Sequence, residues 1–118
     1  HRAPKSTSNP FDQTDWKLIS ELYAILSEMK PGPIVSLNLA IATGYSETPT
    51  AGLDALRKIR GLEDHYLYHA AMGDFHARNG NEPEAQRCYD KAVQLTASHA
   101  EKNLLAMKQT DLLSAASQ

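Results

Sequence analysis

The sequence has little cysteine, no basic excess and no long apolar run, and each shortage excludes a class of protein. Its one cysteine, Cys88, allows neither an internal disulfide nor a Cys-x-x-Cys metal site, which fits a reducing cytosol. The formal net charge is −2, whereas domains that bind nucleic acid through their own surface usually carry a basic excess. No apolar run approaches the roughly 20 residues of a membrane span. We therefore expect a cytoplasmic protein without direct nucleic-acid or membrane partners.

What the chain does contain is enough apolar sequence for one globular domain. It has 118 residues, of which 42% are hydrophobic, and this is too short for two ordinary domains. Residues 1–13 are rich in proline, serine and asparagine, which predicts a linker ahead of a folded domain over residues 14–116. Because the chain opens on His1 rather than methionine, we expect it to be a fragment of a longer protein.

The first helical segment is predicted to begin at Thr14, whose hydroxyl is suited to an N-cap, and to end near Met29. Along it, Leu18, Leu22, Ile25 and Met29 recur at the spacing of an apolar helix face. This pattern predicts an amphipathic helix that opens the domain.

Two more helices are predicted before residue 61. One begins at Pro33 and is apolar nearly all round, with Asn38 as a buried amide, and Gly44 marks the turn after it. The next is capped by Thr48, has proline at its first position and runs to Arg60.

Capping signals predict three further helices. They cover residues 65–79, a segment that Asn81 can cap, and a segment that opens on the capping-box spacing of Ser98 and Glu101. No segment has the alternation of a strand. The sequence therefore predicts an all-α fold of about six helices joined by short turns, arranged as antiparallel pairs.

The fourth and fifth predicted helices contain a spacing that resembles the TPR helix–turn–helix repeat. Small residues allow close helix packing, an aromatic fills the space between pairs, and a glycine makes the turn. The residues in question are Gly73, Gly80, Ala85, Tyr89, Ala92 and Leu95. The resemblance implies a TPR-like right-handed α-α superhelix.

In such repeats the first helix of each pair lines the concave face. Leu67, Asp74 and Arg78 would then face the groove, and they are our candidates for contact with a partner protein. Asp74 and Arg78 are also an i,i+4 pair that could equally just stabilise the helix.

The histidines are the strongest candidates for metal binding in the chain. His65 and His69 lie four residues apart on one helix face, a spacing that metals accept, but His76 lies too far along the axis to join them. Packing and surface roles in a helix explain these histidines better than metal binding does. We assign His69 and Asn38 structural roles. We expect no metal, cofactor or catalytic residue, and hence no enzyme activity.

A wider set of strings, in order and spacing, resembles the C-terminal extension of certain bacterial extracytoplasmic-function (ECF) sigma factors. The resemblance covers residues 14–112 and is carried by Thr14-Asp15-Trp16, residues 33–38, 40–42 and 66–71, Gly80, Glu84-Ala85, Tyr89, Ala92, Ala100-Glu101 and Leu104-Leu105. It implies a regulatory domain that modulates transcription initiation by contacting the attached sigma regions, RNA polymerase or another regulator.

Two other functions stay open from the residues alone. The chain could be a free-standing TPR-like scaffold or adaptor protein, or a small metal-dependent enzyme that uses its histidines. The linker composition and the missing start methionine favour the sigma-factor domain over the scaffold.

Overall fold

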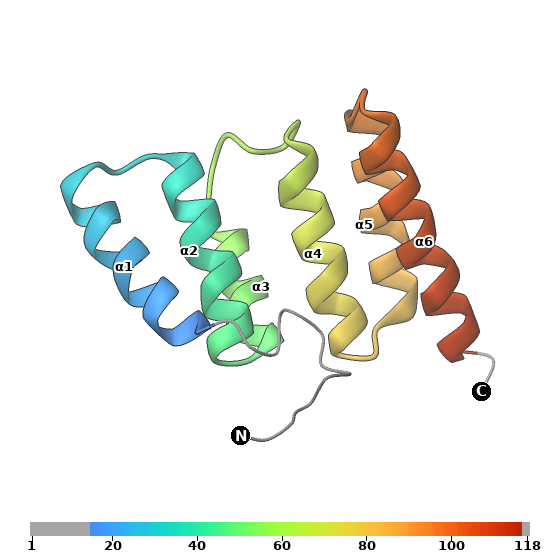
Figure 1. Ribbon diagram of the computed structural model, residues 1–118, viewed down its shortest axis with the longest axis horizontal. Helices are drawn as coiled ribbons and strands as arrows, with labels where there is room; N and C mark the ends of the chain where they lie inside the picture. Colours follow the sequence, from blue (N-terminus) through green and yellow to red (C-terminus); the bar gives the residue numbers. More distant parts are fainter. Residues whose placement is uncertain (1–14, 117–118) are drawn as a thin grey trace, which may run out of the picture.

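The computed structural model describes residues 15–116, and within this range all regular structure is helical. Its six helices are α1 (Trp16–Met29), α2 (Pro33–Ser46), α3 (Pro49–Arg57), α4 (Tyr66–Arg78), α5 (Glu82–Leu95) and α6 (His99–Ala116) (Figure 1). Successive helices run antiparallel and are joined by short turns, except that a longer loop over residues 58–65 connects α3 to α4. The all-α class and the number of helices are confirmed, whereas the predicted linker over residues 1–13 lies outside the described residues.

Short polar residues begin several helices where local sequence predicted them. The Thr48 hydroxyl accepts the Ala51 amide proton at 3.0 Å, and Pro49 occupies the first position of α3. At α6 the Ser98 hydroxyl oxygen accepts from the Glu101 amide at 3.2 Å. These caps satisfy amides that have no partner inside their own helix.

Some predicted ends were wrong. The N-cap of α1 is Asp15, whose carboxylate accepts from the Leu18 amide, and Thr14 lies outside the described residues. Asn81 occupies the N-cap position of α5 but makes no side-chain capping bond. α3 ends at Arg57 rather than Arg60, and the residues beyond it form the loop to α4.

Gly44 is the most informative correction, because it lies inside α2 instead of in a turn. A Cβ atom on Gly44 would stand 2.2 Å from Cζ of Phe75, and one on Gly52 in α3 would stand 2.7 Å from the same ring. The two glycines therefore let α2 and α3 close around one aromatic side chain of α4.

The core has two parts that meet along α4. The first surrounds Phe75, which has 0% exposure, and is shared by α2, α3 and α4. The second surrounds Tyr89 of α5 and includes Ala85, Ala92 and Leu105. Ala85, Tyr89 and Ala92 are therefore buried where α5 packs on α4.

Two glycines of the predicted repeat behave as expected. A Cβ on Gly73 would lie 2.6 Å from the Tyr89 ring, so only glycine allows this approach of α4 to α5. Gly80 adopts a φ of +78° in the turn between them, a region that L side chains rarely occupy. Leu95 is only partly buried at the end of α5, and Asn38 is partly exposed rather than buried.

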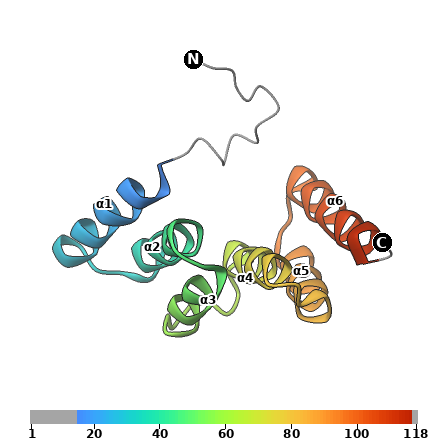
Figure 2. The ribbon, with the colours of Figure 1, turned by 90° about the horizontal axis from the view of Figure 1, so that it is seen from below.

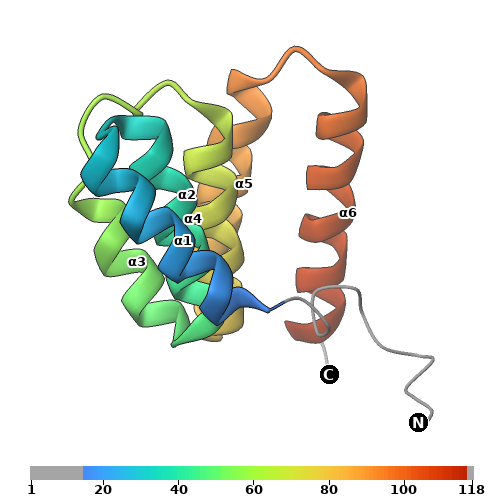
Figure 3. The same ribbon diagram turned by 60° about the vertical axis from the view of Figure 1, so that its left-hand side comes forward.

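The helices form a curved row that is open on one side. Seen from below, α1 and α6 stand at its two ends and project to the same side, with α2 and α4 between them and α3 and α5 behind (Figure 2). In the turned view the ribbon of α6 is set apart from that of α5 (Figure 3), and side chains join the two helices: Gln109 Nε2 of α6 donates to the Asp90 carboxylate of α5 at 2.7 Å. The concave side is therefore framed by α1, α2, α4 and α6.

Candidate functional site

A cavity of about 200 Å³ lies on this concave side, and side chains from α1, α2, α4 and α6 line it. We call it the concave groove. Its α4 floor includes Leu67, Ala70 and Asp74, and α6 contributes Leu104 and Lys108. Leu104 is 50% exposed, so its side chain is accessible from the groove. The groove thus offers a largely apolar surface with a few polar groups, the usual make-up of a binding site.

Aromatic rings form the opposite wall of the groove. Trp16 of α1 stacks on Tyr45 of α2 with ring centroids 4.8 Å apart, and Tyr45 meets the edge of Phe75 at 5.2 Å. The Arg78 guanidinium lies over the Tyr45 ring, 5.1 Å from its centroid. Trp16 therefore packs α1 onto α2. Burial, with the Asp74 charge second, raises the pKa of Tyr45 to about 12, so its phenol is neutral at neutral pH.

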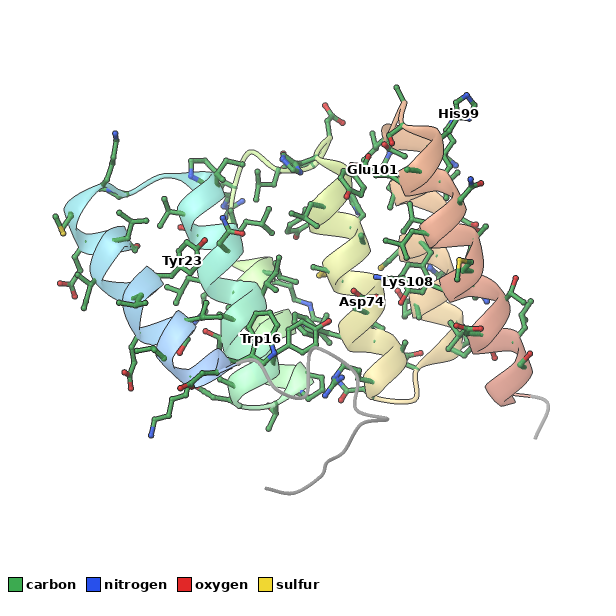
Figure 4. All side chains as sticks on the ribbon, viewed as in Figure 1. Trp16, Tyr23, Asp74, His99, Glu101 and Lys108 are labelled. Carbon is green, nitrogen blue, oxygen red and sulfur yellow. The ribbon has the colours of Figure 1, made fainter. Side chains whose placement is uncertain are left out.

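Asp74 is the polar centre of the groove. Lys108 Nζ of α6 lies 3.0 Å from each Asp74 carboxylate oxygen, and the Tyr89 hydroxyl of α5 donates to one of them at 2.7 Å. Figure 4 places Asp74 and Lys108 facing one another from α4 and α6. Asp74 thus joins three helices, and its ion-pair partner is Lys108 rather than the Arg78 predicted from i,i+4 spacing.

We expect Asp74→Ala to lower the free energy of unfolding by about 1–3 kcal/mol, because it leaves the Tyr89 hydroxyl and the Lys108 ammonium without their partner. The matched control is Asp54→Ala, which removes an exposed carboxylate paired with Arg57 and should change stability by less than about 1 kcal/mol. Urea unfolding of both variants measures the difference. Equal stability of the two would mean that Asp74 does not hold α4, α5 and α6 together.

The predicted contact residues are brought together only in part. Leu67 and Asp74 line the concave groove, whereas Arg78 lies beyond its lining, on the face of Tyr45. Sequence reasoning missed Tyr45 and the α6 side of the groove. The i,i+4 spacing of Leu104 and Lys108 on one face of α6 was the available signal for that side.

Each histidine of α4 has a local structural use. His65 is the N-cap, and its Nδ1 accepts from the Leu67 amide at 3.2 Å. His69 Nε2 lies 2.8 Å from the Glu63 carbonyl oxygen, to which it donates. His76 is buried, and burial lowers its pKa. Among residues 15–116 no group of three or more His, Cys, Asp or Glu side chains is placed to hold a metal ion.

The remaining candidate for reactive chemistry is Cys88 on α5. Burial raises the pKa of its thiol, and the nearby Glu84 carboxylate acts in the same direction. Both influences disfavour the thiolate, which is the reactive form of cysteine. Cys88 is therefore placed as a packing residue.

The fold and the groove define an all-α domain of antiparallel helix pairs with one concave, largely apolar face. None of its described helices has the length and hydropathy needed to cross a membrane. Comparison with known proteins finds no matching family model and no matching solved structure.

One curated protein is clearly similar in sequence. An uncharacterized protein of Rhizobium meliloti (strain 1021) is 33% identical over 98 residues, which make up 82% of this chain. The matched region is 23% of that relative, so this chain spans about a quarter of the relative's length. In the relative, a region similar to this domain is thus part of a much longer chain.

Proposed function

We propose that this domain is a protein-interaction module with a TPR-like arrangement of helix pairs, and that it binds a segment of a partner protein in the concave groove. The observation that carries the proposal is the groove itself, where the half-exposed Leu104 and the partly exposed rings of Trp16 and Tyr45 surround the Asp74–Lys108 ion pair. An apolar groove between helices is a common receptor for an amphipathic helix. Binding, rather than catalysis, is what these side chains favour.

The biological setting we propose is the C-terminal regulatory region of an ECF-type sigma factor, in which the domain modulates transcription initiation through protein contact. The support is the ordered resemblance over residues 14–112, the acidic net charge and a relative in which the similar region belongs to a longer chain. A tethered domain meets its neighbour at high effective concentration, so a modest affinity in the groove would be sufficient. The partner would then be the attached sigma regions, RNA polymerase or another regulator.

The test uses two variants of α6 that differ only in the face they change. Leu104→Arg puts a charge into the groove, whereas Met107→Arg makes the same change at a 62% exposed residue outside it. In a reconstituted reaction with a sigma factor that carries this domain, we expect Leu104→Arg to alter promoter-dependent transcription at least threefold and Met107→Arg to leave it unchanged. Circular dichroism of both variants should remain that of the parent, since neither residue is buried.

Binding is measured separately from transcription. The domain should bind the sigma regions or core polymerase, Leu104→Arg should weaken that binding at least tenfold, and binding to duplex DNA should be absent at all salt concentrations. If deletion of residues 15–116 leaves transcription unchanged and the domain binds none of these proteins, the sigma-factor role is wrong and the free-standing scaffold takes its place.

A further inference from the structure

A row of exposed apolar side chains lies on α1, outside the lining of the concave groove. Four side chains form it, and we call them the α1 stripe: Leu18 (49% exposed), Leu22 (56%), Ile25 (56%) and Met29 (76%). These residues form the apolar face that their spacing predicted, but that face is exposed, and α1 has no buried residue.

The opposite side of α1 makes the contacts with the rest of the domain. Trp16 stacks on Tyr45, and Tyr23 points toward α2 (Figure 4). At about 100° per residue these two side chains lie roughly 140° around the helix from the centre of the α1 stripe. The stripe is therefore a second apolar face, separate from both the core and the groove. A single helix that keeps four large apolar side chains in water marks an interaction surface rather than chance exposure.

The spacing of the α1 stripe indicates what kind of element covers it. Residues 18, 22, 25 and 29 are separated by four, three and four positions, which is the a/d spacing of a coiled-coil seam. Such a seam accepts the side chains of one further α-helix, packed at a shallow angle. A strand or an irregular loop does not match this geometry.

The charges beside the seam indicate which helix fits. With Leu22 and Met29 at a positions, Glu21 and Glu28 both occupy g positions along one edge, and both are exposed. The basic side chain of α1 on that side, Lys17, lies farther from the seam. A second copy packed antiparallel would set the acidic edges against each other, and a parallel copy would set Glu21 against Leu26. A helix with basic residues along its edge is complementary instead.

We propose that the α1 stripe is a docking site for an amphipathic helix whose apolar seam is flanked by lysine or arginine, supplied by another protein segment. It is a second binding surface, independent of the concave groove and of the sigma-factor role proposed above. The apolar seam provides the affinity, and Glu21 and Glu28 select the basic partner.

The probe is a synthetic three-heptad peptide with leucine at its a and d positions and lysine at its e and g positions. Its counterpart has glutamate at e and g, and the like charges keep either peptide from pairing with itself. With the 118-residue chain at low salt, fluorescence anisotropy should show the lysine peptide binding at least tenfold tighter than the glutamate peptide. That preference should shrink as salt is raised, since exposed charges are screened.

A double variant of the α1 stripe and a single variant of the groove locate the peptide on the domain, and two double charge variants test the charge preference. Leu22→Ser with Ile25→Ser should weaken the lysine peptide at least tenfold, whereas Leu104→Ser in the groove should leave its affinity unchanged. Glu21→Lys with Glu28→Lys should reverse the preference, whereas Glu63→Lys with Asp64→Lys, an equal charge change in an exposed loop, should preserve it.

Three results would overturn the proposal. The first is equal affinity for both peptides, and the second is weakening by the groove variant instead of the α1 variant. The third is a dimer of the chain in sedimentation that Leu22→Ser with Ile25→Ser dissolves, which would make a second copy the occupant. A groove variant that fails in transcription while peptide binding at α1 persists would leave this inference intact.

Discussion

Phe75→Ala is expected to lower the free energy of unfolding by about 3–5 kcal/mol. The ring has 0% exposure and is enclosed by α2 and α3. At Gly44 and Gly52 it lies directly against the helix backbone, because glycine has no side chain. Backbone held by helical hydrogen bonds cannot move in to fill the space, so the substitution leaves a cavity in addition to the lost apolar burial. A domain of this size has about 5–15 kcal/mol of stability, so the loss is a large share of it.

Urea or thermal unfolding of the 118-residue chain measures this loss. The matched control is Met29→Ala, which removes a large side chain that is 76% exposed and should change the free energy of unfolding by less than about 0.5 kcal/mol. If Phe75→Ala and Met29→Ala unfold at the same midpoint, then α4 is not packed between α2 and α3 as described.

Tyr89→Ala should have the second-largest effect, a loss of about 3 kcal/mol or more. Tyr89 is 3% exposed and lies against Gly73, so its removal opens the interface between α4 and α5. The same substitution removes the hydroxyl that donates to Asp74, and burial together with the Asp74 charge raises the pKa of this phenol. The phenol therefore keeps its proton at neutral pH, and the hydroxyl remains a donor to Asp74.

Tyr89→Phe separates the ring from the hydroxyl. It keeps the packing against Gly73 and removes only the hydrogen bond to Asp74, so we expect a loss of about 1 kcal/mol. In an Asp74→Ala background the Tyr89→Phe change should cost less, because its partner is already gone. A Tyr89→Phe loss as large as that of Tyr89→Ala would mean that the hydrogen bond, and not the ring, holds α5 on α4.

Much of the fold could be predicted because it depends on neighbours within a few residues. Thr48 and Pro49 start α3, Pro33 starts α2, and Gly80 turns the chain between α4 and α5, all as their local chemistry indicated. The small residues around Tyr89 were recognisable for a related reason, since a close helix crossing accepts few side chains. These features require no knowledge of distant segments.

Tertiary packing decided the points at which sequence reasoning was wrong or incomplete. Glycine is typical of turns, so Gly44 was predicted to mark one. It lies inside α2 instead, where the absence of a side chain leaves room for the Phe75 ring. Asp74 had an available partner four residues away in Arg78, yet it pairs with Lys108, which is 34 residues distant and brought near by α6. Local spacing identifies possible partners, and the fold determines which of them is close enough to bind.

The α1 stripe shows the same difference between what local spacing predicts and what the fold determines. The sequence by itself determined that Leu18, Leu22, Ile25 and Met29 share one apolar face of a helix, because a period of 3.6 residues is a local property. Only the tertiary structure decided that this face points to solvent. Trp16 and Tyr23, on the opposite side of α1, make its contacts with α2. Periodicity reports that a face is apolar, and burial depends on which surfaces the remaining helices leave available to cover it.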